Sequence, residues 1–122
     1  MPRIIHFEIN CDDPERAAKF YREVFGWKIE KWDGPMEYWL ASTGPKEQPG
    51  IDGGLMRREQ PGAGTINTME VDSLDDYLKK VASGGGKLIS PKQAVPGVGW
   101  FANCTDTEGN VFGLMQNDPN AK

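Results

Sequence analysis

The chain has 122 residues, 38% of them hydrophobic, and its 14 basic and 18 acidic residues give a formal net charge of −4. This length suits one domain with a real core, and so mild a charge, with no stripe of Lys and Arg, does not favour nucleic acid or a membrane surface as a partner. No apolar run approaches the ~20 residues of a membrane span, so we expect a cytoplasmic protein, with Cys11 and Cys104 as free, buried thiols.

The chain begins with an alternating segment over residues 3–10. Period-two alternation of side chains is typical of a strand, and here both faces carry residues that need a neighbour. The sequence therefore predicts a first strand with two occupied faces. One face holds Ile5, Phe7 and Ile9, and the other holds Ile4, His6 and Glu8.

A helix with clear boundaries follows this strand. Asp13 is a good N-cap, Pro14 suits the first helical position, and Gly26 is a natural stop. The apolar positions between them repeat at helical spacing, which predicts one packed face. That face consists of Ala17, Phe20, Tyr21, Val24 and Phe25.

Three short strands complete the first half of the chain. Residues 27–32 and 37–42 flank an Asp-Gly-Pro turn and are predicted to form a hairpin, because such turns join antiparallel strands. A Gly- and Pro-rich loop then leads to a strand over 51–57. Residues 58–64 are predicted to be a linker.

The second half of the chain repeats this order. A strand over 65–71 precedes a helix that Ser73 caps, with Asp76 in the reciprocal position. The helix has the apolar stripe Leu74, Tyr77, Leu78, Val81 and Ala82, and Gly84-Gly85-Gly86 ends it. Further strands are predicted over 87–90, 100–105 and 110–116, with a surface loop over 91–99.

Two short motifs occur twice, about sixty residues apart, which indicates two copies of one structural unit. The motifs are Trp39-Leu-Ala41 with Gly54-Leu-Met56, and Trp100-Phe-Ala102 with Gly113-Leu-Met115. We therefore predict an α+β fold and a single domain over 1–122. Its two β-α-β-β-β modules, over 1–60 and 61–122, would form one eight-stranded cupped mixed sheet with the helices on its outer face.

These features resemble the vicinal oxygen chelate superfamily, which holds glyoxalase I, extradiol dioxygenases and bleomycin-binding proteins. The resemblance covers nearly the whole chain and is closest to small bacterial glyoxalase-related proteins of unassigned substrate. It is carried by His6-Phe-Glu-Ile9, by the helix that starts Asp13-Pro-Glu-Arg and ends Val24-Phe-Gly-Trp27, and by Asp106-Thr-Glu-Gly-Asn-Val-Phe-Gly-Leu-Met115.

The resemblance implies four metal-ligand positions, one each on the first, fourth, fifth and eighth predicted strands. His6 matches the first, while Gly54, Ile66 and Gly113 stand at the other three and have no side chain that binds metal. A catalytic divalent site normally needs three protein ligands. We therefore predict no firm cofactor, and the expected metal chemistry is largely lost.

Two carboxylates share the predicted cavity face with the only histidine. Glu8 lies beside His6, and Glu70 lies on the equivalent face of the fifth predicted strand. These three are the candidate catalytic residues, with His6 as a general base, because an imidazole has a suitable pKa. A divalent metal held by all three is an open alternative, as are a structural role for His6 and a hydrated rim position for both acids.

Aromatic and sulfur-containing side chains suggest a pocket for an organic ligand. Flat rings stack on flat ligands, Met side chains adapt to them, and a glycine at a vacant metal position would deepen the cavity. The same residues could equally pack in the core or a dimer contact. The candidate lining consists of Trp39, Gly54, Met56, Thr68, Trp100, Gly113 and Met115.

Two main functions remain open at this stage, beside a protein-interaction role in which the groove takes a partner segment. One is a glyoxalase-related, lyase-, isomerase- or oxygenase-like enzyme acting on a small carbonyl or oxygenated metabolite with a degenerate metal site. The other is a non-catalytic binding protein for a small, antibiotic-type molecule. For both we expect a small-molecule ligand and a homodimer.

Overall fold

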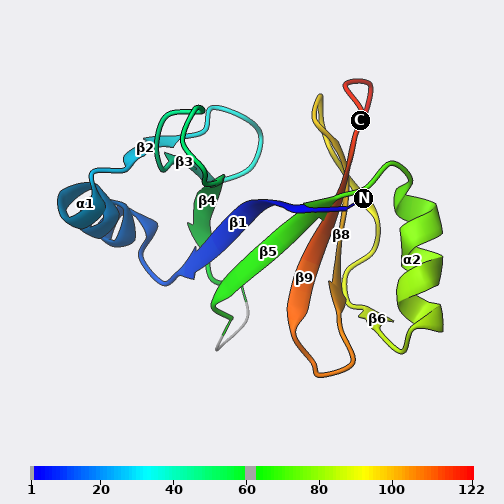
Figure 1. Ribbon diagram of the computed structural model, residues 1–122. Helices are drawn as coiled ribbons and strands as arrows, with labels where there is room; N and C mark the ends of the chain where they lie inside the picture. Colours follow the sequence, from blue (N-terminus) through cyan, green and yellow to red (C-terminus); the bar gives the residue numbers. More distant parts are fainter. Residues whose placement is uncertain (1, 60–62) are drawn as a thin grey trace. The chain divides into compact units, whose positions relative to one another are not determined.

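The computed structural model describes residues 2–59 and 63–122 and contains nine strands and two helices in this part of the chain. Two compact units are present. The first spans His6–Ile66, and the second contains Asn67–Lys122 together with the start of the chain up to Ile5. Each unit combines one helix with strands of a mixed sheet (Figure 1), so the predicted α+β class is confirmed.

The first module has the predicted β-α-β-β-β order. Its sheet runs β2-β3-β4-β1, with β1 parallel to β4 and the β2–β3 hairpin antiparallel, as expected from the Asp-Gly-Pro turn. Observed boundaries differ from the predicted ones by one or two residues. The elements are β1 (Ile4–Cys11), α1 (Pro14–Phe25), β2 (Lys28–Lys31), β3 (Trp39–Ser42) and β4 (Asp52–Arg57).

Local chemistry fixes both ends of α1. The Asp13 carboxylate accepts a hydrogen bond from the Arg16 N–H at 3.1 Å, and Gly26 adopts a left-handed conformation with φ of 72°. The helix packs on one face of its sheet through Ala18, which has no exposed surface. This packing gives the first core, made of Cys11, Ala18, Ile29, Trp39, Ala41 and Leu55.

The second module repeats the pattern with one addition. Residues 91–99, predicted to be a surface loop, contain a short strand, β7, that pairs antiparallel with β8. The sheet runs β5-β9-β8-β6, with β5 parallel to β9. The elements are β5 (Thr65–Glu70), α2 (Leu74–Ser83), β6 (Lys87–Leu88), β7 (Gln93–Val95), β8 (Gly99–Thr105) and β9 (Val111–Asn117).

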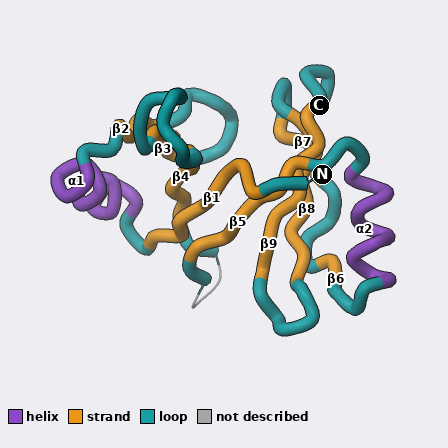
Figure 2. Tube along the Cα trace, viewed as in Figure 1, coloured by secondary structure: helices purple, strands orange, loops and turns teal. Residues whose placement is uncertain are grey.

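The helix α2 covers one face of this sheet, where it lies alongside β6 and β8 (Figure 2). The Ser73 hydroxyl accepts from the Asp76 N–H at 3.3 Å, as the predicted cap requires. Leu74, the first residue of α2, is fully buried. The second core consists of Val71, Leu74, Ala102, Cys104 and Leu114.

The two modules differ in the register of one strand pair. Trp39 lies opposite Leu55, whereas Trp100 lies opposite Gln116 and Ala102 lies opposite Leu114. Relative to the Gly-Leu-Met motif on the paired strand, the Trp-x-Ala motif of the second module is thus shifted by two residues. The sequence repeat implied that Trp39 and Trp100 occupy matching positions, and this expectation is wrong. A shift of two preserves the face, so both tryptophans still face the helix of their own module.

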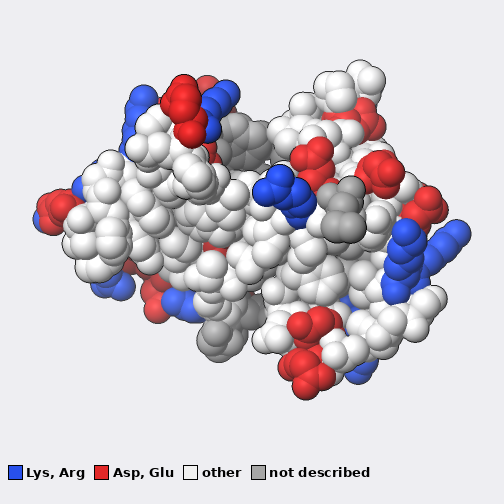
Figure 3. Space-filling view, in the orientation of Figure 1, with Lys and Arg blue, Asp and Glu red and all other residues white. Residues whose placement is uncertain are grey.

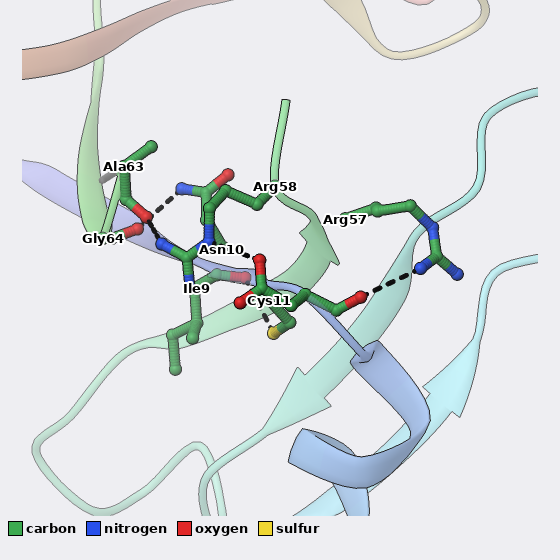
Figure 4. A network of polar contacts seen from close by, with 8 residues as sticks. Ile9, Asn10, Cys11, Arg57, Arg58, Ala63 and Gly64 are labelled. Atoms are coloured by element: carbon green, nitrogen blue, oxygen red, sulfur yellow. Dashed lines mark hydrogen bonds and ion pairs between the residues drawn. The ribbon is translucent and has the colours of Figure 1, made fainter. Parts of the chain in front are cut away.

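Polar contacts anchor the described ends of the segment that follows β4 (Figure 4). The Asn10 amide and backbone N–H both donate to the Gly64 carbonyl, at 2.6 and 3.2 Å. The Arg58 guanidinium donates to the Asp12 carboxylate at 2.9 Å and to the Ala63 carbonyl. The predicted linker over 58–64 is therefore tied to the end of β1, although residues 60–62 lie outside the described part.

An Arg58→Ala variant is expected to lower the free energy of unfolding by about 1–2 kcal/mol, because a half-buried cation loses charge-assisted and carbonyl hydrogen bonds. Urea denaturation measures the change. Lys46→Ala, at an exposed loop position, is the control and should change it by less than about 0.5 kcal/mol. Equal midpoints for the two variants would contradict the anchoring role.

The remaining expectations concern the surface and the thiols. Cys11 and Cys104 are free and buried, as predicted, and burial raises the pKa of both thiols. Basic and acidic side chains are interspersed on the visible face of each module (Figure 3). Neither described helix is sufficiently long and apolar to traverse a membrane. The cytoplasmic location stays a prediction.

Candidate active site

The candidate site lies on the face of the first module's sheet that α1 does not cover. His6 and Glu8 alternate with the core-facing residues of β1, and their partners across the parallel pair are Asp52 and Gly54. Side chains two residues apart on a strand share a face, which is why the sequence predicts His6 and Glu8 on one face. Both side chains are half-buried in the structure.

Tyr38, immediately before β3, connects these two residues. Its hydroxyl lies 2.6 Å from His6 Nε2. The Glu8 carboxyl group is near enough to this hydroxyl for each group to shift the pKa of the other. The Tyr38 and His6 rings are stacked, with 6.2 Å between centroids. The Trp32 and Tyr38 rings pack in a T-shaped pair with 6.5 Å between their centroids. An aromatic wall therefore borders the three polar groups.

Gly54 makes room for Tyr38. A Cβ atom at Gly54 would overlap the Tyr38 ring and its hydroxyl. The predicted consequence of glycine at this metal-ligand position was a deeper cavity; instead the Tyr38 ring fills the space. The aromatic residue was not a predicted site residue, and a glycine next to an aromatic-rich strand was the signal that could have indicated it.

Burial dominates the electrostatics of the three groups. Burial lowers the pKa of His6, an effect that the negative charge of Asp52 partly opposes. Burial also raises the pKa of Glu8; the hydrogen bond from Tyr38 opposes this shift, and the nearby Glu59 carboxylate adds to it. The pKa of Tyr38 is strongly raised, mainly by burial and also by Glu8, so its phenol stays protonated.

These shifts define the proton arrangement. Neutral His6 is favoured at pH 7, because burial disfavours the imidazolium. If the single Tyr38 proton is donated to the ionised Glu8 carboxylate, the phenol oxygen accepts from His6 Nε2–H. In this arrangement Nδ1 of His6 carries the free lone pair and can take a proton from another molecule.

A Tyr38→Phe variant is expected to raise the pKa of Glu8 further, because the hydrogen bond that lowers it is lost while burial remains. The Glu8 carboxyl resonance in a ¹³C NMR titration measures the midpoint, which should move to higher pH. Tyr77→Phe, in the second module, is the matched control and should leave it unchanged. An unshifted midpoint in Tyr38→Phe would show that the phenol does not hold the carboxylate.

The second module has a related arrangement around Gly113. Thr68 on β5 and Asn103 on β8 are the two neighbours of Gly113 across the strands. A Cβ atom at Gly113 would lie 2.8 Å from both the Phe101 ring and the Thr68 hydroxyl, so here too an aromatic ring covers the glycine.

The other predicted site residues lie in several environments. Trp39 is 3% exposed in the first core, and its Nε1 donates to Glu15 at 2.7 Å, so its ring has no free face for a ligand. Trp100 packs against the second core and donates to Asp118. Exposed Glu70 accepts from Asn117 at 3.0 Å. Met56 and Met115 are half-buried, Ile66 is half-buried at the predicted metal-ligand position, and ligand contact by any of them stays a prediction.

The described residues do not fit the metal site of the resemblance. Tyr38 covers Gly54 and Phe101 covers Gly113, so rings occupy the space at two of the four ligand positions. In residues 2–59 and 63–122, no group of three or more His, Cys, Asp or Glu side chains is arranged to hold a metal ion. The polar set at His6 is a base, a phenol and a carboxyl group, which is suited to proton transfer.

Comparisons with known proteins agree with this fold. Residues 3–44 match the family model described as bleomycin resistance protein-like N-terminal. A glyoxylase-like domain-containing protein of Didymella fabae is 32% identical over 117 residues, which cover 92% of this chain and 91% of that protein. CFP32 of Mycobacterium bovis, whose name describes it as a glyoxylase, is 28% identical over 120 residues; the match covers 95% of this chain but only 44% of that longer protein.

A solved structure shares the fold across both modules. Methylmalonyl-CoA epimerase of Mycobacterium tuberculosis superposes with a TM-score of 0.71 at 16% identity, covering 95% of this chain and 88% of that one. The fold and the sequence similarities define a protein of the vicinal oxygen chelate superfamily. The chain belongs to its glyoxalase-like family.

Proposed function

We propose that the chain is a glyoxalase-like enzyme that transfers a proton at a carbon next to the carbonyl of a small metabolite, with His6 as the base. The observation that carries the proposal is the Tyr38 hydroxyl 2.6 Å from His6 Nε2, with Glu8 near enough to the same hydroxyl to shift its pKa. Relatives with glyoxylase names and the epimerase fold support an enzyme of this general kind.

Each group has a defined task in this reaction. His6 Nδ1 takes the proton from the substrate carbon, and the electron pair of the broken C–H bond moves into the carbonyl to give an enolate. Tyr38 fixes the ring and accepts from Nε2–H, so the imidazolium that forms stays oriented. Ionised Glu8 accepts from the phenol and stabilises the positive charge on His6. Return of the proton to a different carbon or face completes an isomerisation.

Hydrogen exchange with solvent tests this proposal without knowledge of the physiological substrate. Hydroxyacetone, glyceraldehyde and methylglyoxal hemithioacetal are incubated with the protein in D₂O, and loss of their C–H signals is followed by ¹H NMR. At least one should exchange faster than in buffer of the same pH. Because the pKa of His6 is lowered, the rate should rise with pH and level off below the ordinary histidine value of 6.5. No acceleration with any of the three would contradict the proposal.

The aromatic wall favours a second candidate function, the binding of a flat organic molecule without turnover. Trp32, Tyr38 and His6 are adjacent rings, and the match to the bleomycin resistance-like family covers all three residues. Saturable quenching of tryptophan fluorescence by an aromatic ligand, lost in a Trp32→Phe variant and accompanied by no exchange activity, would favour binding alone.

We also propose that the protein forms a homodimer. Its main partner would be a small-molecule ligand. Helix α1 carries exposed Phe20, Val24 and Phe25, with 54%, 55% and 59% of their surfaces accessible. Exposed apolar clusters of this kind favour association. Sedimentation equilibrium should give twice the mass of the 13.5 kDa chain, and a monomer at all concentrations would contradict the assembly.

A further inference from the structure

A cavity of about 310 Å³ lies where the start of the chain meets the connection between β5 and α2. Figure 1 shows these two segments beside each other, and both belong to one compact unit. Cavities of this size take small organic molecules. The lining combines apolar and charged side chains, among them Ile5, Val71, Tyr77, Arg3, Glu70 and Asp72.

This cavity is separate from the candidate active site. Arg3 and Ile5 alternate with His6 along the start of the chain, so they lie on the opposite face of β1. Val71 belongs to the second core, and Tyr77 packs against that core from α2. The cavity therefore lies on the side of the sheet that the helix covers, away from the face that carries His6.

Backbone hydrogen bonds hold the walls of the cavity together. The Glu70 N–H donates to the Arg3 carbonyl at 3.3 Å, which joins the start of the chain to the end of β5. The Val71 N–H donates to the Met115 carbonyl at 2.9 Å, so the end of β5 is also tied to β9. The walls are thus already formed in the absence of a ligand.

The charged groups of the lining are not paired with each other. Arg3 and Asp72 are exposed, and the ion pairs within the described residues involve other side chains. Glu70 is engaged outside the cavity, because its Oε1 accepts from Asn117 Nδ2 at 3.0 Å. Arg3 is therefore left as a donor for an anionic group, and Asp72 as an acceptor for a cationic one.

We propose that this cavity binds a small zwitterion, an α-amino acid with an apolar side chain. The Arg3 guanidinium donates to the ligand carboxylate, for which its fork of N–H groups is suited, and the Asp72 carboxylate accepts from the ligand ammonium. Ile5 and Val71 contact the apolar side chain of the ligand. Lys80 Nζ already lies 4.3 Å from the centroid of the Tyr77 ring, so this ring provides an apolar contact and not an open face for stacking.

L-phenylalanine is the probe, and two analogues that each lack one charge are its matched controls: 3-phenylpropionate and 2-phenylethylamine. Amide resonances of Ile5, Val71, Asp72 and Tyr77 are followed by ¹⁵N NMR during titration of the whole chain. L-phenylalanine should give saturable shifts at these residues, with about tenfold higher affinity than either analogue, because each analogue loses one charge-assisted contact. No saturable shift at these residues up to the solubility limit, or an analogue that binds equally well, overturns the proposal.

Two variants of exposed residues assign the contacts. Arg3→Gln should lower the affinity for L-phenylalanine to that for 2-phenylethylamine and leave the binding of this amine unchanged. Asp72→Asn should lower it to that for 3-phenylpropionate. Glu108→Gln, at an exposed position in the turn between β8 and β9 of the same unit, is the control and should leave the affinity unchanged. Unchanged affinity in Arg3→Gln or Asp72→Asn, or an equal loss in Glu108→Gln, overturns the proposal. Neither result bears on proton transfer at His6.

Discussion

A His6→Gln variant is expected to lose hydrogen exchange into the carbonyl substrate by a factor of about 10²–10⁴, the usual contribution of a positioned general base. Glutamine is similar in length and can still donate to the Tyr38 oxygen, but it cannot take up a proton at pH 7. The first module contains no other imidazole that could replace it, because His6 is the only histidine in the chain. Initial rates of C–H signal loss in D₂O measure the effect.

A matched variant separates the loss of a base from a general loss of structure. Glu30→Gln changes an exposed carboxylate on β2 of the same module and should leave the exchange rate within about twofold. Circular dichroism should be the same for both variants. If His6→Gln exchanges at the rate of the native chain, His6 is a structural residue, which is the alternative that the sequence left open.

The elements were predictable because local chemistry decides them. Asp13 and Pro14 start α1, Gly26 ends it, and Ser73 starts α2, as the sequence indicated. Period-two alternation placed His6 and Glu8 on a face away from the α1 core. β7 was missed since three residues between a proline and a glycine-rich turn carry too short a pattern for a strand assignment.

The register of the hairpins could not be predicted from the repeat. Matching Trp39 with Trp100 implied equal roles, but β8 is shifted by two residues against β9 compared with β3 against β4. This shift makes Phe101, and not Gly99, the counterpart of Tyr38. Register depends on cross-strand packing over the whole module, which a short motif does not contain.

Only part of the site was predictable, because its residues come from separate segments whose relative positions depend on register. His6 and Glu8 come from one strand, so alternation alone places them together. Tyr38 reaches them from the residue before β3, and its position depends on the absence of a side chain at Gly54. The sequence showed the loss of metal ligands, whereas only the structure shows the rings that occupy the space.

Gly54 therefore carries the second large prediction. A Gly54→Ala variant is expected to lower the free energy of unfolding by about 2–4 kcal/mol, because the added methyl group overlaps Tyr38 and the half-buried bond to His6 is lost with it. Displacement of the phenol should also raise the pKa of Glu8, as in Tyr38→Phe. Urea denaturation and the Glu8 titration measure the two effects on one protein.

Gly44→Ala is the matched control, since its Cβ would meet only the Gln48 side chain at 3.5 Å, an ordinary contact. It should change the unfolding free energy by less than about 1 kcal/mol. Adding Tyr38→Phe to Gly54→Ala should cost little more, because both changes break the same contacts and their effects are not additive. Fully additive losses would mean that Gly54 is required for backbone reasons alone, and that the ring occupies this position without holding the base.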